Sequence, residues 1–429
     1  MGMQRLASAG SALGLCALLV LTACGPMPPV RAALYGDLPT LRREIERAER
    51  AGKLDREALR ELAEAVASRE IASARGADGV RRLRALRGCA RPLLPVLRDR
   101  SERDDDVAAE AMLARLLHDD ATAPQLVERH ARSTSGAWRA VAARAATDPR
   151  DALLRRSYYL DPDERVRRAA LEAALDAPVK ADLEPLLEAF RLDPDPLNRS
   201  LAARAAGAIG GESAVLGLKD RFARADEQGQ LAVIDAWAMP ASRAHGGERQ
   251  LRLIAEGKQG LVSVSAADAL LRTGDRDGSL VGLLVTAIER GTEEERRLAL
   301  LVAPDSDARV APAVAQAAKD ENAEVRVIAL ARLAGDAPHA AEAKKALREL
   351  AARKDDVGVQ ARAALAATGD RTVIATLVAE VRHGHPSRRQ SAALALVRLG
   401  ESGKAALALG DPDPGVRVAV ACDVLTVTQ

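Results

Sequence analysis

The stretch Asp161-Pro-Asp-Glu-Arg-Val-Arg-Arg-Ala-Ala-Leu-Glu-Ala-Ala-Leu175 decides the fold. Asp-Pro marks the start of a helix, because Asp caps free backbone amides and Pro tolerates the first helical turn. Val166, Ala169, Ala170 and Ala173 then follow the i, i+3, i+4, i+7 spacing of one buried helix face. The stretch therefore predicts a capped amphipathic helix that packs closely against a neighbour through small side chains.

This sequence motif recurs along the chain. Clear copies begin at Asp193, Asp320, Asp355, His385 and Asp411. Aligned after the first apolar helical residue, the copies fall 28 to 34 residues apart, at Ala108, Arg139, Arg167, Arg199, Leu231, Val264, Arg297, Arg326, Gln360, Arg389 and Arg417. One helix pair cannot bury its own apolar surfaces, so a period near 30 predicts pairs stacked in a row. We expect an all-α solenoid, a superhelix of about 11 helix-pair repeats.

Composition agrees with this fold. Apolar residues make up 48% of the chain but aromatic residues only 2%, so Ala, Leu and Val fill the interior and thin helices must approach closely. The 63 basic residues are balanced by 61 acidic ones. Nucleic-acid binding needs an excess of basic residues to displace phosphate counterions, so nucleic acid is not an expected partner.

The N-terminus has the features of a secretory signal. Arg5 precedes a short apolar core from Leu13 to Leu21, too short to span a bilayer. The ending Leu21-Thr22-Ala23-Cys24 resembles the lipobox of bacterial lipoproteins. This resemblance implies cleavage between Ala23 and Cys24 and acylation of Cys24, and Gly25 after the cysteine favours the outer membrane, facing the periplasm.

The repeats resemble the HEAT family, in the short bacterial variant also seen in phycobilin lyases, over roughly residues 100–429. The family implies that the Arg-bearing second helix of each repeat lines the concave side. It also implies a polar ladder pairing Asp161 with Arg167, Asp193 with Arg199, and Asp411 with Arg417, with Arg326 and Arg389 in equivalent places. The pattern departs from the family at Leu231, Val264 and Gln360, where the arginine is missing.

Four segments follow: a signal peptide (1–23), a lipidated Pro-rich tether (24–32), a helical capping region (33–100) and the solenoid (101–429). We expect a curved rod on the order of 100 Å long. In such a rod, Cys89 and Cys422 lie too far apart for a disulfide and are interpreted as small buried hydrophobes.

Motifs for chemistry are weak. His383-Gly-His385 is a close histidine pair, but no third ligand lies near it in sequence, so a solvated turn is the preferred interpretation. We expect no catalytic, cofactor-binding or metal-binding residues. Trp138 and Trp237 fall at apolar helix positions and predict core packing, whereas Tyr158 and Tyr159 are the better candidates for surface contact with a partner.

The leading functional hypothesis is a membrane-anchored, non-catalytic scaffold of the bacterial cell envelope that binds protein partners along its concave groove. An envelope enzyme or carrier, with a site built between repeats, is one alternative. A purely structural envelope spacer is another.

Overall fold

The computed structural model describes residues 28–118, 123–257 and 260–428. The predicted signal peptide, its cleavage pair Ala23 and Cys24, and the lipidation of Cys24 lie outside these residues. All regular elements in the described ranges are helical, so the predicted all-α fold is confirmed. The deciding stretch forms α11 (Glu164–Asp176), where Asp163 accepts a hydrogen bond from the Arg165 amide.

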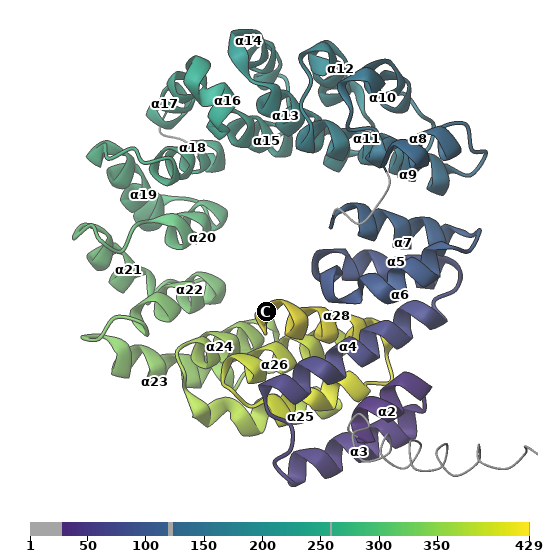
Figure 1. Cartoon of the computed structure of the whole chain (residues 1–429). Coiled ribbons are helices and arrows are strands. Elements are labelled where there is room, and N and C mark those ends of the chain that lie inside the picture. The colour runs from purple at the N-terminus through teal and green to yellow at the C-terminus, as the bar shows by residue number, and fades with distance from the viewer. Residues whose placement is uncertain (1–27, 119–122, 258–259, 429) are drawn as a thin grey trace, which may run out of the picture.

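The helices form pairs, with one helix of each pair toward the inside of the arrangement and the other toward the outside (Figure 1). The inner helices, which carry the repeated phrase, are α7 (Asp106–Leu116), α9 (Gly136–Ala145), α11, α13 (Pro196–Ile209), α15 (Glu227–Ala238), α18 (Gly260–Arg272), α20 (Glu293–Val302), α22 (Ala323–Leu333), α24 (Asp356–Ala367), α26 (Pro386–Arg398) and α28 (Pro414–Val427). The outer helices are α6 (Leu94–Ser101), α8 (Ala123–His130), α10 (Ala152–Tyr158), α12 (Leu183–Leu192), α14 (Gly211–Phe222), α17 (Glu248–Glu256), α19 (Gly278–Arg290), α21 (Val310–Ala317), α23 (Ala340–Ala351), α25 (Ile374–His383) and α27 (Ser402–Ala405). The short helix η7 (Ala406–Gly410), which follows α27, packs on α28.

Each inner helix packs against the inner helices before and after it. Small residues set the spacing. A Cβ atom placed on Gly207 of α13 would lie only 2.6 Å from the Cα atom of Ala236 in α15, so these backbones approach as closely as a glycine allows. Because Ala and Gly fill these contacts, the core needs few aromatic side chains.

The row of helix pairs closes on itself, so the expectation of an open rod is wrong. α28 packs against α4 (Arg56–Ser73) and α5 (Gly76–Leu86), and Figure 1 shows the yellow C-terminal helices crossing the purple N-terminal ones. The Arg417 guanidinium lies 2.5 Å from the Glu70 carboxylate, and Arg56 donates a 2.6 Å hydrogen bond to the Val427 carbonyl. The rotation between successive pairs adds up to a ring.

The N-terminal region therefore does not act as a free cap. A cap would leave one polar face toward solvent, but α4 instead packs on α28, whose buried residues include Val420 and Val424. The predicted tether is also too long. Residues 28–32 belong to α2 (Pro28–Tyr35), in which Val30 and Ala33 are buried, because prolines at a helix start do not interrupt its hydrogen bonding.

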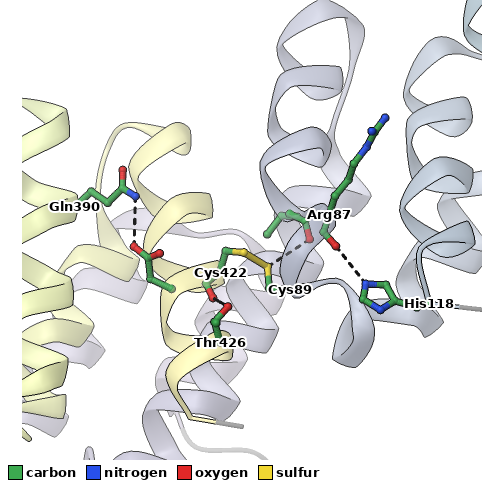
Figure 2. The surroundings of a disulfide bond; sticks show 8 residues. Arg87, Cys89, His118, Gln390, Cys422 and Thr426 are labelled. Carbon is green, nitrogen blue, oxygen red and sulfur yellow. Dashed lines mark hydrogen bonds between the residues drawn. A yellow bond between two sulfur atoms is a disulfide. The ribbon is translucent and has the colours of Figure 1, made fainter. Parts of the chain in front are cut away.

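Cys89 and Cys422 form a disulfide across this closure, with their Cα atoms 5.4 Å apart (Figure 2). The prediction of two separate cysteines is wrong because it depended on the open rod. Cys89 is fully buried in the short helical segment after α5, and Cys422 lies on α28. The disulfide thus joins the first and last parts of the ring covalently.

Peptide mapping under non-reducing conditions should recover one cross-linked peptide that contains Cys89 and Cys422. Cys89→Ser and Cys422→Ser should each lower the free energy of unfolding, by about 2–4 kcal/mol, because the unfolded chain regains the entropy that the closed loop removes. Chemical denaturation of the two variants measures this loss. Two free thiols in the air-oxidised native protein would contradict the structure.

Candidate protein-binding face

Arginines at equivalent positions connect the turns of neighbouring pairs. Arg139 of α9 donates to the carbonyls of Ser133 and Thr134 in its own turn, at 3.1 and 3.0 Å. It also donates to both carboxylate oxygens of Asp161 in the next turn, at 2.8 and 2.9 Å. Each such arginine therefore fixes its own turn and the turn of the next repeat.

The same arrangement continues around the ring. Arg167 binds the Asp193 carboxylate at 2.8 Å and the Asp161 carbonyl at 2.9 Å. In each predicted ladder pair, the arginine therefore binds the backbone carbonyl of the aspartate. The carboxylate that the same arginine binds belongs to the following repeat. The other links to a following turn are Arg199 with Asp226 (2.7 Å) and Arg389 with Asp411 (2.7 Å), and Arg417 joins the Asp411 carbonyl to Glu70. Arg326 binds the Asp320 and Glu321 carbonyls of its own turn. Glu70 of α4 therefore continues the ladder across the closure.

The structure corrects the repeat register in four places. The ladder residue stands four positions after the helix N-cap, and the N-caps of α7, α15, α20 and α24 are Asp105, Asp226, Thr292 and Asp355. The equivalent residues are therefore Ala109, Gln230, Arg296 and Val359, each one position away from the predicted Ala108, Leu231, Arg297 and Gln360. Arg296 lies 2.9 Å from Asp320, so that repeat does have its arginine. In these copies the apolar spacing misplaces the ladder residue by one position, whereas the N-cap locates it.

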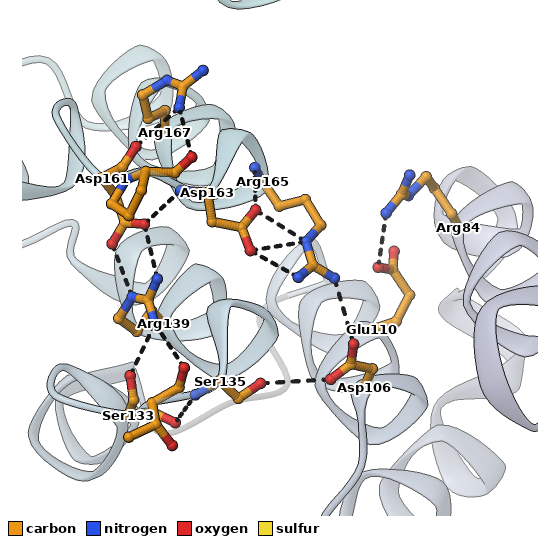
Figure 3. A network of polar contacts seen from close by, with 12 residues as sticks. Arg84, Asp106, Glu110, Ser133, Ser135, Arg139, Asp161, Asp163, Arg165 and Arg167 are labelled. Carbon is orange, nitrogen blue, oxygen red and sulfur yellow. Dashed lines mark hydrogen bonds and ion pairs between the residues drawn. The ribbon is translucent and has the colours of Figure 1, made fainter.

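The inner face between α5 and α11 carries a charged network (Figure 3). α9 presents Gly136 there, and a Cβ atom at this residue would lie 1.9 Å from an oxygen of Asp163. Because α9 has no side chain at Gly136, Arg165 of α11 reaches past it and lies 3.5 Å from Asp106 on α7. Arg165 also pairs with Asp163 at 2.7 Å. The Arg165 guanidinium holds the pKa of Asp163 below its usual range, so this carboxylate stays ionised.

This network surrounds a narrow recess of about 200 Å³. Small side chains form its floor, among them Ala109, Ala137, Ala140 and Ala169. Charged side chains form its rim, namely Arg84, Arg87, Asp106, Glu110, Arg165, Arg168 and Glu172. Glu110 is almost completely buried and pairs with Arg87 at 2.6 Å, whereas the Arg84 side chain is 46% exposed. The recess can hold a small side chain of a partner, and its rim offers both charges to the segment around it.

Sequence reasoning missed this recess. The rim residues come from α5, the short helix η1 (Arg87–Cys89) that follows it, α7 and α11, and only the packing of these helices around α9 brings them together. The alanines and Gly136 in α9 are the one local signal, because only the small Ala137 and Ala140 of α9 line the recess.

Tyr158 and Tyr159 were expected at the surface, and this prediction is wrong. They are 3% and 5% exposed, and burial raises the pKa of Tyr158 to about 12. The chain turns back directly after α10, with the Asp161 amide bonded to the Tyr158 carbonyl, so Leu160 is the exposed residue at 83%. Trp138 and Trp237 are buried, as predicted.

His383 and His385 are both exposed at the turn between α25 and α26. Across the described ranges, no group of three or more His, Cys, Asp or Glu side chains is arranged to hold a metal ion. No helix within those ranges has the length and apolar character needed to cross a bilayer. No known family model matches the sequence, and no curated protein matches it.

Removing a ladder arginine should cost more than removing an exposed one. Arg167→Met leaves the buried Asp193 carboxylate without its guanidinium and should lower the free energy of unfolding by about 2–3 kcal/mol. Arg150→Met is the matched control, because Arg150 pairs with Asp148 at the surface and its loss should change stability little. Urea denaturation of both variants makes the comparison, and equal losses would show that the ladder contributes nothing specific.

Proposed function

We propose that this chain is a membrane-tethered, non-catalytic scaffold of the bacterial cell envelope that holds a protein partner on the inner face of its ring. The recess between α5 and α11 carries the proposal. It combines an alanine floor with charges of both signs, most of them exposed or half-buried. A floor of this kind suits a small apolar side chain, and a rim of this kind suits a polypeptide of mixed charge, since complementary charges set the register of a partner.

The disulfide supports the envelope part of the proposal. Structural disulfides persist in oxidising compartments and are rare in the cytosol of most bacteria. Cys89 and Cys422 form such a bond between the two ends of the ring. An exported chain meets the conditions in which this bond is stable. The lipobox-like ending at Cys24 then supplies a membrane anchor.

Site-specific photo-crosslinking in cells tests the inner face. A crosslinking amino acid at Arg84, on the rim of the recess, should capture one defined polypeptide. The same amino acid at Arg191 should not capture it, because Arg191 lies on the outer helix α12 with a similarly exposed side chain.

Charge reversal extends this test. Arg84→Glu should lower recovery of the captured polypeptide about tenfold, as read from a crosslinker at a second rim position, because it places a carboxylate beside Glu110. Arg191→Glu should leave recovery unchanged. Identical products at positions 84 and 191, or none at 84, would refute binding at this face.

A further inference from the structure

A second, larger pocket lies where the α23–α24 and α25–α26 turns meet, with a volume of about 640 Å³. Five of its lining residues are cationic, namely Arg348, Arg353, Lys354, Arg362 and Arg388, whereas Glu380 is the one carboxylate among them. The proposed scaffold function does not use this pocket.

Four of these five cations lie near a carboxylate, and Lys354 does not. Arg362 is buried and paired with Glu380, while Arg348 and Arg353 pair with Asp370 and Asp355. Arg388 lies 3.6 Å from Asp356. Counting these carboxylates, five cations face four anions and one positive charge remains. Lys354 carries it, because its exposed ammonium group makes no hydrogen bond or ion pair among the described residues.

The floor of the pocket is apolar in part, because Ala351 and Val373 are buried there beside Arg362. Ala352 and Ala379 line it with exposed side chains, and more of its surface is carbon than nitrogen or oxygen. A small inorganic anion would gain nothing from such a floor, since only its charge would be recognised. An anionic amphiphile would use both parts, with its charged group at Lys354 and Arg388 and its carbon chain on the alanines.

The pocket also lies toward the N-terminal part of the ring. His383 lines it and lines a neighbouring cleft of about 540 Å³, which α3 (Leu38–Arg50) closes from the other side. Arg382 in that cleft has no hydrogen bond or ion pair in the described ranges, so a second unpaired cation lies beside His383, whereas α3 lines the cleft with Arg42 and Arg50 and with Glu46 and Glu49. α2 begins at Pro28, four residues after Cys24, and four residues span at most roughly 14 Å. A lipid on Cys24 therefore holds the α2–α3 end of the ring at the membrane.

We infer that this pocket binds the phosphate-bearing headgroup of an anionic membrane lipid, with the phosphate at Lys354 and Arg388 and the adjoining carbons on the apolar floor. The inference rests on the proposed membrane tether, which brings this end of the ring to the bilayer surface. Binding there orients the ring on the membrane, because it adds a second point of attachment to the lipid anchor.

The test is a calorimetric titration of the full chain carrying Cys24→Ser, which has no acyl group of its own. Dihexanoylphosphatidylglycerol, kept below its micelle concentration, should bind at least tenfold more tightly than dihexanoylphosphatidylcholine or inorganic phosphate. Lys354→Glu should weaken phosphatidylglycerol binding at least tenfold. Lys219→Glu, which reverses an exposed lysine on the outer helix α14, should leave it unchanged.

Unchanged binding by the Lys354→Glu chain would overturn the inference. Equal binding of phosphatidylcholine would overturn it too, because the charge would then have no role. Inorganic phosphate that binds as tightly as the lipid would make this a free-anion site. The titration uses neither the anchor nor a protein partner. A failure of the proposed function would instead appear as wild-type chain in the soluble cell fraction, or as no capture at position 84.

Discussion

A row of helix pairs has two ends, and the apolar helix face at each end is unfavourable when it is exposed to water. In this chain the two end faces pack against each other, so neither remains exposed. Helix α28, in which Val420 and Val424 are buried, packs against α4 and α5 on one side and α26 on the other, so the last pair is covered by neighbours as a pair in the middle of the row is. Polar contacts follow the same logic, because Glu70 on α4 receives Arg417 as turn aspartates receive the arginines elsewhere.

This constraint determines where partners can bind. The apolar faces of the inner helices are buried against neighbouring helices, so a partner must bind a surface that this packing leaves exposed. Two kinds of surface remain. One is the inner face, where thin helices such as α9 leave recesses between charged side chains. The other is the set of turns, where Lys354 has no ion pair among the described residues and lies beside apolar side chains. We assign the first to a protein partner and the second to the membrane, and the closure places both on one ring.

Local features of the fold could be predicted from the sequence, whereas its closure could not. The Asp caps and the spacing of Val166, Ala169, Ala170 and Ala173 describe α11 correctly, because capping and amphipathicity are local. The register failed by one residue at Arg296, because the alignment followed the apolar spacing and did not count from the N-cap Thr292. The ring depends on a small rotation at every interface, and no single repeat reveals the sum. Cys89 and Cys422 therefore seemed distant, and the recess around Ala140, drawn from four helices, had no signature in any one of them.

Small-angle X-ray scattering of the chain carrying both Cys89→Ser and Cys422→Ser measures whether the ring stays closed without its disulfide. Without the disulfide, only the packing of α28 on α4 and its ion pairs hold the two ends together. We expect the double variant to give the pair-distance distribution of a closed ring, matching that of the oxidised wild-type chain. A longer maximum dimension, with the extended shoulder of an open curved rod, would contradict it.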